Sequence, residues 1–177
     1  MSYKTNNFDL NKYVITINDF PKKGIFFRDL TPLWKDSKAF SFVIDEIASK
    51  LKNTSIDLIL APEARGFILA SALSYKTGIP FLPIRKKDKV TRPGTFIEYE
   101  CEYSTNVLGI ATEDLKSNLN ILIIDDVIAT GNTTKAIFSL AKKFNCKVVF
   151  QVYLIRLKID SNKETINSTD NFYFIEL

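Results

Sequence analysis

Two adjacent carboxylates and a threonine-rich loop lie close together in the stretch NILIIDDVIATGNTTKA, residues 120–136. Asp125 and Asp126 directly follow a run of aliphatic residues, and the loop comes a few positions later. Carboxylates accept hydrogen bonds from sugar hydroxyls and also hold hydrated Mg²⁺. Backbone N–H groups at the start of a helix bind anions such as phosphate. A sugar that carries a phosphate would satisfy both halves of this stretch.

The predicted anion-binding loop precedes a helix and offers hydroxyl donors beside its backbone amides. It consists of Ala129, Thr130, Gly131, Asn132, Thr133 and Thr134. Gly131 permits a positive φ or a close approach of the backbone. A plain threonine N-cap is the alternative interpretation of the same residues. The loop lacks the Gly-Lys-Ser/Thr of a Walker A loop and the GxGxxG of a dinucleotide fold, so neither of those sites is indicated.

The chemistry open to this chain is restricted by its composition. The sequence contains no histidine, which excludes histidine-based acid–base catalysis, Ser–His or Cys–His nucleophiles and His-ligated metals. Its two cysteines, Cys101 and Cys146, match no metal-ligand spacing. Any reaction must therefore rest on carboxylates, hydroxyls, Lys, Arg, Tyr and backbone amides.

Length and charge favour one globular domain over the whole chain, residues 1–177. No apolar run approaches the roughly 20 residues that span a membrane, and the N-terminus lacks a secretory pattern, so we expect a cytoplasmic protein without membrane contact. The net charge is +4, and most lysines are scattered, which does not indicate nucleic-acid binding. One local exception, RKKDK at 85–89, is either a solvated surface or a site for a small anion.

Hydrophobic periodicity predicts an α/β fold. Helices are expected at 37–51, 66–76 and 133–144, strands at 57–61, 81–84, 121–124 and 148–155, and a loop or hairpin arm at 90–103. This alternation indicates a parallel sheet with helices on both faces. Ligands bind beyond the carboxyl ends of the strands in such sheets, which is where Asp125 and Asp126 are expected.

The stretch ILIIDDVIATGNTT resembles the phosphoribosyl-pyrophosphate (PRPP) motif of the type I phosphoribosyltransferases. Three further segments resemble those of the adenine phosphoribosyltransferases within that family. INDFPKKGIFFRDLTP at 17–32 is similar to the base pocket, EARGF at 63–67 to the pyrophosphate loop, and 84–103 to the mobile catalytic loop. The resemblance implies a type I phosphoribosyltransferase fold with a small N-terminal base-binding hood, about residues 1–34, and a mobile hairpin.

The resemblance also implies a reaction. Adenine and PRPP would give AMP and pyrophosphate in purine salvage, catalysed by a homodimer. Mg²⁺ would be held mainly by PRPP and water, with no direct metal ligand from the protein. Breaking the bond to pyrophosphate places negative charge on the leaving group, so preorganised cations and amides would stabilise it.

Site residues follow from the resemblance, position by position. Pyrophosphate would contact Glu63, Ala64, Arg65, Arg85, Lys86 and Lys89. Asp125 and Asp126 would hold the ribose hydroxyls, and loop 129–134 the 5′-phosphate. Glu102 would transfer a proton at the purine, with Tyr103 beside it and Arg65 as a further catalytic residue. The base would lie against Ile25, Phe26, Phe27 and Arg28, with Phe27 stacking on the ring.

Within this base-binding turn, one of the two phenylalanines is expected in the core, because both cannot face one ligand. Asp29 is expected to anchor Arg28.

Two other functions are compatible with the PRPP motif. A 6-oxopurine phosphoribosyltransferase would share the loop but not the segment FPKKGIFFRD, which favours adenine. A non-catalytic, PRPP-sensing regulator would carry an added DNA-binding domain, for which the sequence before residue 17 leaves no room. The chain departs from the family pattern at Cys101, Ser104 and Asn132, and it matches little after Lys158.

Overall fold

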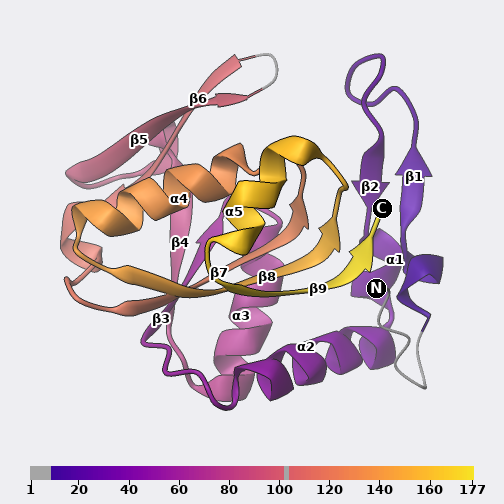
Figure 1. The fold of residues 1–177 in the computed structure, drawn as a ribbon, viewed down its shortest axis with the longest axis horizontal. Helices are drawn as coiled ribbons and strands as arrows, with labels where there is room; N and C mark the ends of the chain where they lie inside the picture. The colour runs from indigo at the N-terminus through magenta and orange to yellow at the C-terminus, as the bar shows by residue number, and fades with distance from the viewer. Residues whose placement is uncertain (1–8, 102–103) are drawn as a thin grey trace.

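The computed structural model describes residues 9–101 and 104–177, whose strands form a seven-stranded and a two-stranded sheet (Figure 1). The large sheet contains β3 (Leu58–Pro62), β4 (Phe81–Lys86), β5 (Gly94–Cys101), β6 (Ser104–Ala111), β7 (Asn120–Ile128), β8 (Lys147–Arg156) and β9 (Asp170–Glu176). The small sheet pairs β1 (Ile15–Ile17) with β2 (Phe27–Asp29). The helices are α1 (Thr31–Lys35), α2 (Ser37–Leu51), α3 (Gly66–Thr77), α4 (Asn132–Lys143) and α5 (Lys163–Asn167), with short 3₁₀ turns between elements.

The large sheet is mainly parallel, as the sequence predicts. Its strand order is β5-β6-β4-β3-β7-β8-β9, and neighbouring strands from β4 to β9 are parallel. Within this sheet only β6 runs antiparallel to its neighbours, β5 and β4. The carboxyl ends of β4, β3, β7, β8 and β9 therefore meet along one edge of the sheet.

Strand β7 shows how the sheet is buried on both faces. Its side chains alternate between two apolar clusters, since successive residues of a strand point to opposite faces. Leu122 and Ile124 pack in the cluster that includes α2 and α3, whereas Ile121 and Ile123 pack with α4. Helices therefore cover both faces, which confirms the predicted architecture.

The structure differs from the predicted elements at β7. This strand was expected to stop at 124, but it continues to Ile128 because its pairing with β8 runs on to Arg156. Asp125 and Asp126 consequently lie inside the last part of a strand rather than beyond it. Cross-strand pairing, which no local pattern reveals, sets this boundary.

Six further helices and strands of the described chain were not predicted: β1, β2, α1, β6, α5 and β9. Strand β9 extends the sheet beside β8, so that β8 lies between two parallel neighbours, β7 and β9. Its sequence DNFYFIE alternates, with Phe172 and Phe174 buried, and this period of two was a usable signal.

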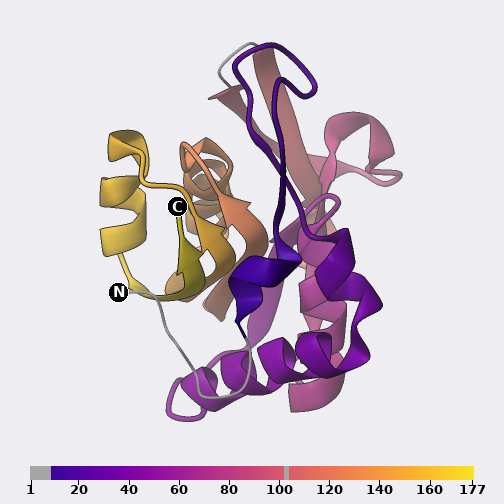
Figure 2. The same ribbon diagram turned by 90° about the vertical axis from the view of Figure 1, so that its right-hand side faces the viewer.

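Two projections stand over the carboxyl edge of the sheet. The connection between β1 and β2 and the far end of hairpin β5–β6 extend to the same side of the molecule (Figures 1 and 2). They occupy the places of the base-binding hood and the catalytic hairpin that the resemblance implies. Ligands at this edge would therefore be approached from two sides.

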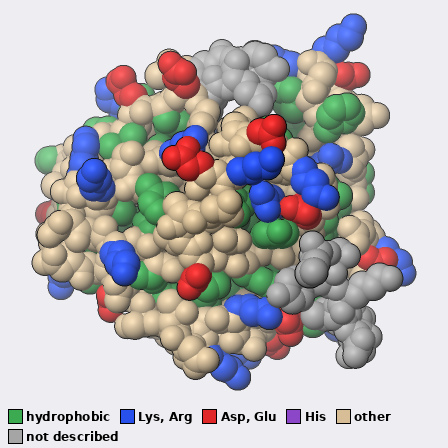
Figure 3. All heavy atoms as spheres, in the orientation of Figure 1, with side chains coloured by type: hydrophobic (Ala, Val, Ile, Leu, Met, Phe, Trp, Pro, Cys, Tyr) green, Lys and Arg blue, Asp and Glu red, His purple; other side chains and the backbone are tan. Residues whose placement is uncertain are grey.

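Charges are mixed on the face drawn in Figure 3, where Lys and Arg side chains are dispersed among Asp and Glu.

No helix in the described part of the chain combines the length and the apolar character that crossing a bilayer requires.

Helix α3 comes very close to β7 at its first residue, and this contact yields a prediction. A Cβ atom at Gly66 would lie 3.0 Å from Ile124 O and 3.2 Å from Asp125 Oδ1. We expect Gly66→Ala to lower the free energy of unfolding by about 1–3 kcal/mol, because overpacking outweighs a helix-propensity gain of at most about 1 kcal/mol. Activity should fall as well, since Asp125 is displaced.

Denaturant unfolding measures the effect of Gly66→Ala, with Ser71→Ala as the control. Ser71 is exposed on the same helix, so its replacement should change stability by less than about 0.5 kcal/mol. Equal stability of Gly66→Ala and the unaltered protein would show that α3 can move away from β7 freely.

Candidate active site

A cavity of about 650 Å³ lies at the carboxyl ends of β3, β4 and β7. Its lining includes Glu63, Arg85, Lys86, Asp125 and Thr133. These residues come from three segments that the sequence assigned separately to pyrophosphate, ribose and phosphate. The structure therefore brings members of all three groups to one cavity.

The carboxylate of Glu63 organises the cations of this cavity. Its side chain is only 8% exposed, and its oxygens accept from Lys89 Nζ at 2.6 Å, Lys86 N at 3.1 Å and Arg85 Nε at 3.2 Å. These donors, Lys89 above all, lower the pKa of Glu63 to about 2, so the carboxylate is ionised at neutral pH. The peptide bond from Glu63 to Ala64 is cis.

Arg65 takes a different direction from the other cations of the predicted pyrophosphate site. Its Nε lies 2.8 Å from Asp126 Oδ2, and its Nη1 donates to the carbonyl of Arg28 at 3.0 Å. Its guanidinium also lies over the ring of Phe27, 4.9 Å from the centroid. Arg65 thus connects an acid of the PRPP motif to the predicted base-binding segment.

The two aspartates occupy different environments because neighbours on a strand point to opposite sides. Asp125 lines the cavity, and its Oδ1 accepts from the N–H of Asp126 at 2.9 Å. Asp126 is 2% exposed and faces Arg65. Burial raises the pKa of Asp125 well above its usual range, and the neighbouring charge of Asp126 raises it further. Burial also raises the pKa of Asp126, against the opposing effect of Arg65.

The loop 129–134 leads into α4 through a glycine rather than a threonine cap. Gly131 is the N-cap, with φ +83°, and no side chain caps the helix, so the alternative of a plain threonine N-cap is wrong. Thr133 lines the cavity, but Thr134 is buried with its Oγ1 3.0 Å from the hydroxyl of Tyr153. The Thr134 hydroxyl is therefore turned into the core.

Asn132, one of the departures from the family pattern, contacts the hairpin. Its Nδ2 donates to the carbonyl of Glu100 on β5 at 2.9 Å. Glu102 and Tyr103, the predicted proton-transfer residue and its neighbour, lie outside the described residues.

A second cavity, of about 380 Å³, contains the predicted base-binding segment. Its lining includes Ile25, Phe26, Phe27, Arg28, Arg65, Val127 and Ala129. Phe26 is 58% exposed, and Phe27 is half-buried with its ring edge-on to Phe20 at 5.3 Å. The expectation that one of these two phenylalanines belongs to the core is therefore wrong, because this segment lies on the two-stranded sheet, outside the main layers.

The interaction expected between Asp29 and Arg28 is also absent from the described contacts. Asp29 instead accepts from the N–H and hydroxyl of Thr31, at 2.8 and 2.6 Å, while Arg28 donates to Thr16. The carboxylate of Asp29 therefore binds Thr31, two residues later at the start of α1, instead of Arg28.

Sequence reasoning missed the far wall of the second cavity. Val127 stands between the acids and the loop, and the segment after β8 contributes Leu157, Lys158 and Ile159. Val127 could have been predicted from the sequence, because it is the apolar residue directly after the two acids of the motif. The residues after β8 gave no local signal, because only the path of the chain brings them to the base-binding segment.

Comparison with known proteins decides the family. Residues 34–176 match the phosphoribosyl transferase domain family. The adenine phosphoribosyltransferase of Mycoplasma capricolum is 46% identical over 84% of this chain and 88% of its own length. That of Thermotoga neapolitana is 41% identical over 92% of this chain and 95% of its own. The chain belongs to the adenine phosphoribosyltransferase family.

Solved structures of the family share the whole fold. The adenine phosphoribosyltransferase of Thermoanaerobacter pseudethanolicus superposes with a TM-score of 0.89 at 37% identity, covering 95% of this chain and 98% of that one. The Giardia lamblia enzyme, solved with 9-deazaadenine, also gives 0.89, at 27% identity and 96% coverage of both chains. The chain is therefore a pentosyltransferase with the type I phosphoribosyltransferase fold.

The aspartate pair of this family member predicts opposite stability effects for two similar substitutions. The pKa of Asp125 is higher in the folded than in the unfolded chain, so its ionised form destabilises the fold at pH values above the folded pKa. At pH 8 we expect Asp125→Asn to raise the free energy of unfolding, because the substitution removes a buried charge. Asp126→Asn should lower it by about 1–3 kcal/mol, because the loss of the ion pair with Arg65 at 2.8 Å outweighs the relief of a buried negative charge.

Both substitutions should lower kcat/KM at least about 100-fold, corresponding to about 3 kcal/mol of lost transition-state binding. Denaturant unfolding and steady-state kinetics provide the two measurements. Equal destabilisation by both variants would contradict the assignment of different environments to the two carboxylates.

Proposed function

We propose that this chain transfers the phosphoribosyl group of PRPP to adenine, with AMP and pyrophosphate as products, in purine salvage. The observation that carries this proposal is that one strand borders both cavities. Asp125 of β7 lines the larger cavity, while Val127 of the same strand lines the cavity of the base-binding segment. A ribose on the acids and a base on Phe27 would thus be neighbours. Support comes from the yeast relative, 25% identical with a TM-score of 0.83, which was solved with adenine.

The ribose and its phosphate are assigned to β7 and the loop after it. Asp125 reaches the 2′- and 3′-hydroxyls from the cavity, and loop 129–134 receives the 5′-phosphate through its N–H groups and Thr133. Asp126 is buried against Arg65, so its contact with ribose requires that Arg65 turn away. We propose that Arg65, 39% exposed at its side chain, turns toward pyrophosphate when PRPP binds.

The remaining cations stabilise the leaving group. We assign Arg85, Lys86 and Lys89 to this role. Glu63 holds the guanidinium of Arg85 and the ammonium of Lys89 before the substrate arrives, and it also accepts from the backbone N–H of Lys86. Preorganised cations of this kind need no rearrangement as negative charge develops on pyrophosphate. We therefore assign Glu63 the role of positioning the cations of the pyrophosphate site. Ala64, which follows Glu63 through a cis peptide bond, is assigned a backbone contact with pyrophosphate.

The base is assigned to the smaller cavity. Phe27 stacks on the purine, backbone groups at Phe26 and Arg28 read its edge, and Ile25 adds apolar contact. Glu102 transfers the proton at the purine ring, with Tyr103 beside it, by resemblance to the family. Closure of the hairpin would exclude water, which competes as a nucleophile.

The side chains at this site are compatible with a Mg²⁺ ion that is held by PRPP rather than by the protein. Among the described residues, no three or more His, Cys, Asp or Glu side chains are grouped to hold a metal. Mg²⁺ typically keeps several waters and binds one or two carboxylates together with substrate phosphates. The oxygens of PRPP and water would hold it, and it would neutralise charge on the pyrophosphate.

The proposal extends to the whole chain. We infer a single domain over 1–177, whose first residues, about 1–34, supply the base pocket. We also propose that the enzyme is a homodimer and works in the cytoplasm.

A purine panel tests the proposed reaction. With Mg²⁺ and PRPP, we expect AMP and pyrophosphate from adenine, and at least about 100-fold lower kcat/KM with hypoxanthine, guanine or xanthine, because unpaired polar groups at the purine edge reduce binding. EDTA should abolish turnover, and excess MgCl₂ should restore it.

Three results would change these assignments. Efficient nucleotide formation from a 6-oxopurine without AMP formation would refute the choice of adenine. PRPP binding without turnover of any purine would instead identify a regulator. Full activity of the double variant Asp125→Asn, Asp126→Asn would refute the ribose-holding role of the acids.

A further inference from the structure

The segment that follows β8 packs against the back of loop 129–134. It contains the 3₁₀ turn Asp160–Asn162 and helix α5, which lies beside α4 (Figure 1). A Cβ atom added to Gly131 would come within 3.1 Å of Thr165 Oγ1 and 3.4 Å of Asn162 Cβ. The backbone of the loop therefore rests directly on this segment.

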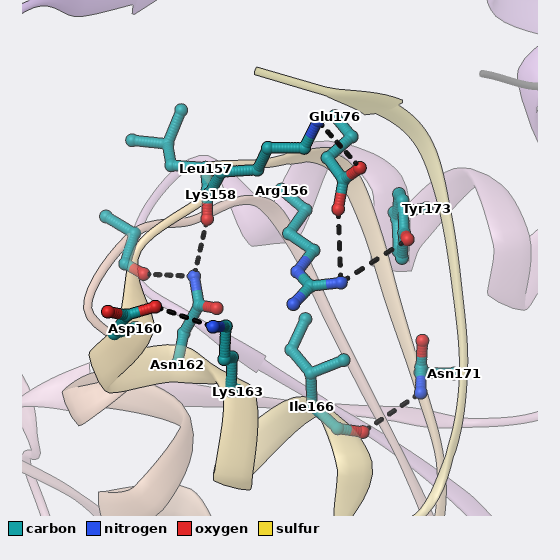
Figure 4. Close-up of polar contacts among 11 residues, drawn as sticks. Arg156, Leu157, Lys158, Asp160, Asn162, Lys163, Ile166, Asn171, Tyr173 and Glu176 are labelled. Carbon is teal, nitrogen blue, oxygen red and sulfur yellow. Dashed lines mark hydrogen bonds and ion pairs between the residues drawn. The ribbon is translucent and has the colours of Figure 1, made fainter. Parts of the chain in front are cut away.

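The amide of Asn162 makes the polar part of this contact. The residue is 0% exposed, and its Nδ2 lies 2.6 Å from the carbonyl oxygen of Ala129 and 2.7 Å from that of Leu157 (Figure 4). Both amide hydrogens are thereby used. The reverse orientation would place Oδ1 against two carbonyl oxygens, so the partners determine how the amide is oriented.

The bond to Ala129 sets the direction of the next N–H group in the loop. In a trans peptide unit the C=O and the following N–H point to opposite sides, and the peptide bond after Ala129 is not among the cis bonds of the described chain. Because the Ala129 carbonyl points to Asn162, the N–H of Thr130 points away from the C-terminal segment. An anion bound at the start of α4 would accept a hydrogen bond from this N–H group on that side.

The second partner, Leu157, belongs to the wall of the base cavity. Its N–H donates to the carbonyl of Ile128 at 3.0 Å, and its own carbonyl accepts from Asn162. Leu157 and Ala129 both line the smaller cavity. A single buried amide therefore ties the first residue of the phosphate loop to the wall beside the base.

We propose that Asn162 is a positioning residue: it holds loop 129–134 in the conformation that receives the 5′-phosphate and keeps the adjoining base-cavity wall aligned with it. The inference rests on the proposed function, which assigns the phosphate to this loop. Asn162 acts through the carbonyls of Ala129 and Leu157 and touches no substrate. Loss of its two bonds therefore weakens PRPP binding more than it slows the transfer step.

Kinetics of Asn162→Ala test this role against a matched asparagine. Asn171 on β9 also donates from Nδ2 to two carbonyls, those of Ile166 at 2.9 Å and Thr169 at 3.2 Å. We expect Asn162→Ala to raise the KM for PRPP about 10-fold or more and to lower kcat less than about threefold, as two lost hydrogen bonds predict. Asn171→Ala should leave that KM within about twofold. A folded Asn162→Ala protein with an unchanged KM would overturn the inference, as would equal effects of the two variants.

A measurement on the unaltered chain covers the case in which Asn162→Ala does not fold. Ribose 5-phosphate is titrated into ¹⁵N-labelled protein, and the amide resonances are followed. We expect the backbone amides of Thr130 and Gly131 and the side-chain NH₂ of Asn162 to shift, while the NH₂ of Asn171 stays in place. Shifting loop amides with a stationary Asn162 would overturn this inference alone. Stationary loop amides would overturn the phosphate site of the proposed function, and this inference with it.

Discussion

The ion pair between Arg65 and Asp126 is the contact on which the arrangement of the site depends. A buried carboxylate is costly unless a cation and hydrogen bonds compensate it, and Asp126 has its cation 2.8 Å away. The same guanidinium reaches the Arg28 carbonyl and the Phe27 ring. One side chain thus holds three segments together: the turn after β3, the end of β7 and strand β2, which belongs to the predicted base-binding segment.

Charge is arranged differently in the two halves of the site. Around Glu63, one ionised carboxylate with a pKa of about 2 gathers cations in advance of an anionic substrate. Burial raises the pKa values of both Asp125 and Asp126, and the charge of Asp126 raises that of Asp125 further, so negative charge is held there at a cost in stability. Such a cost is tolerated where a ligand supplies the missing hydrogen bonds.

Strand β7 runs from the packed core of the protein to the two cavities of the candidate site. Its first half buries aliphatic residues on both faces between α4 and the pair α2–α3, which fixes its position. Its second half remains hydrogen-bonded to β8, and two of its side chains, Asp125 and Val127, line the two cavities. Rigid pairing up to Ile128 positions the loop that follows, and Asn162 supports that loop from behind.

The sequence by itself determined the family motif, the alternation of strands and helices, and most residues that meet at the cavities, because periodicity and motif spacing are local properties of the chain. Tertiary structure decided the rest. The turn of Arg65 toward Asp126, the burial of the Thr134 hydroxyl on Tyr153, and the support of Ala129 by Asn162 each join residues 19 to 61 positions apart. Such contacts depend on how the strands are ordered in the sheet and where the C-terminal segment returns, and no local pattern encodes either.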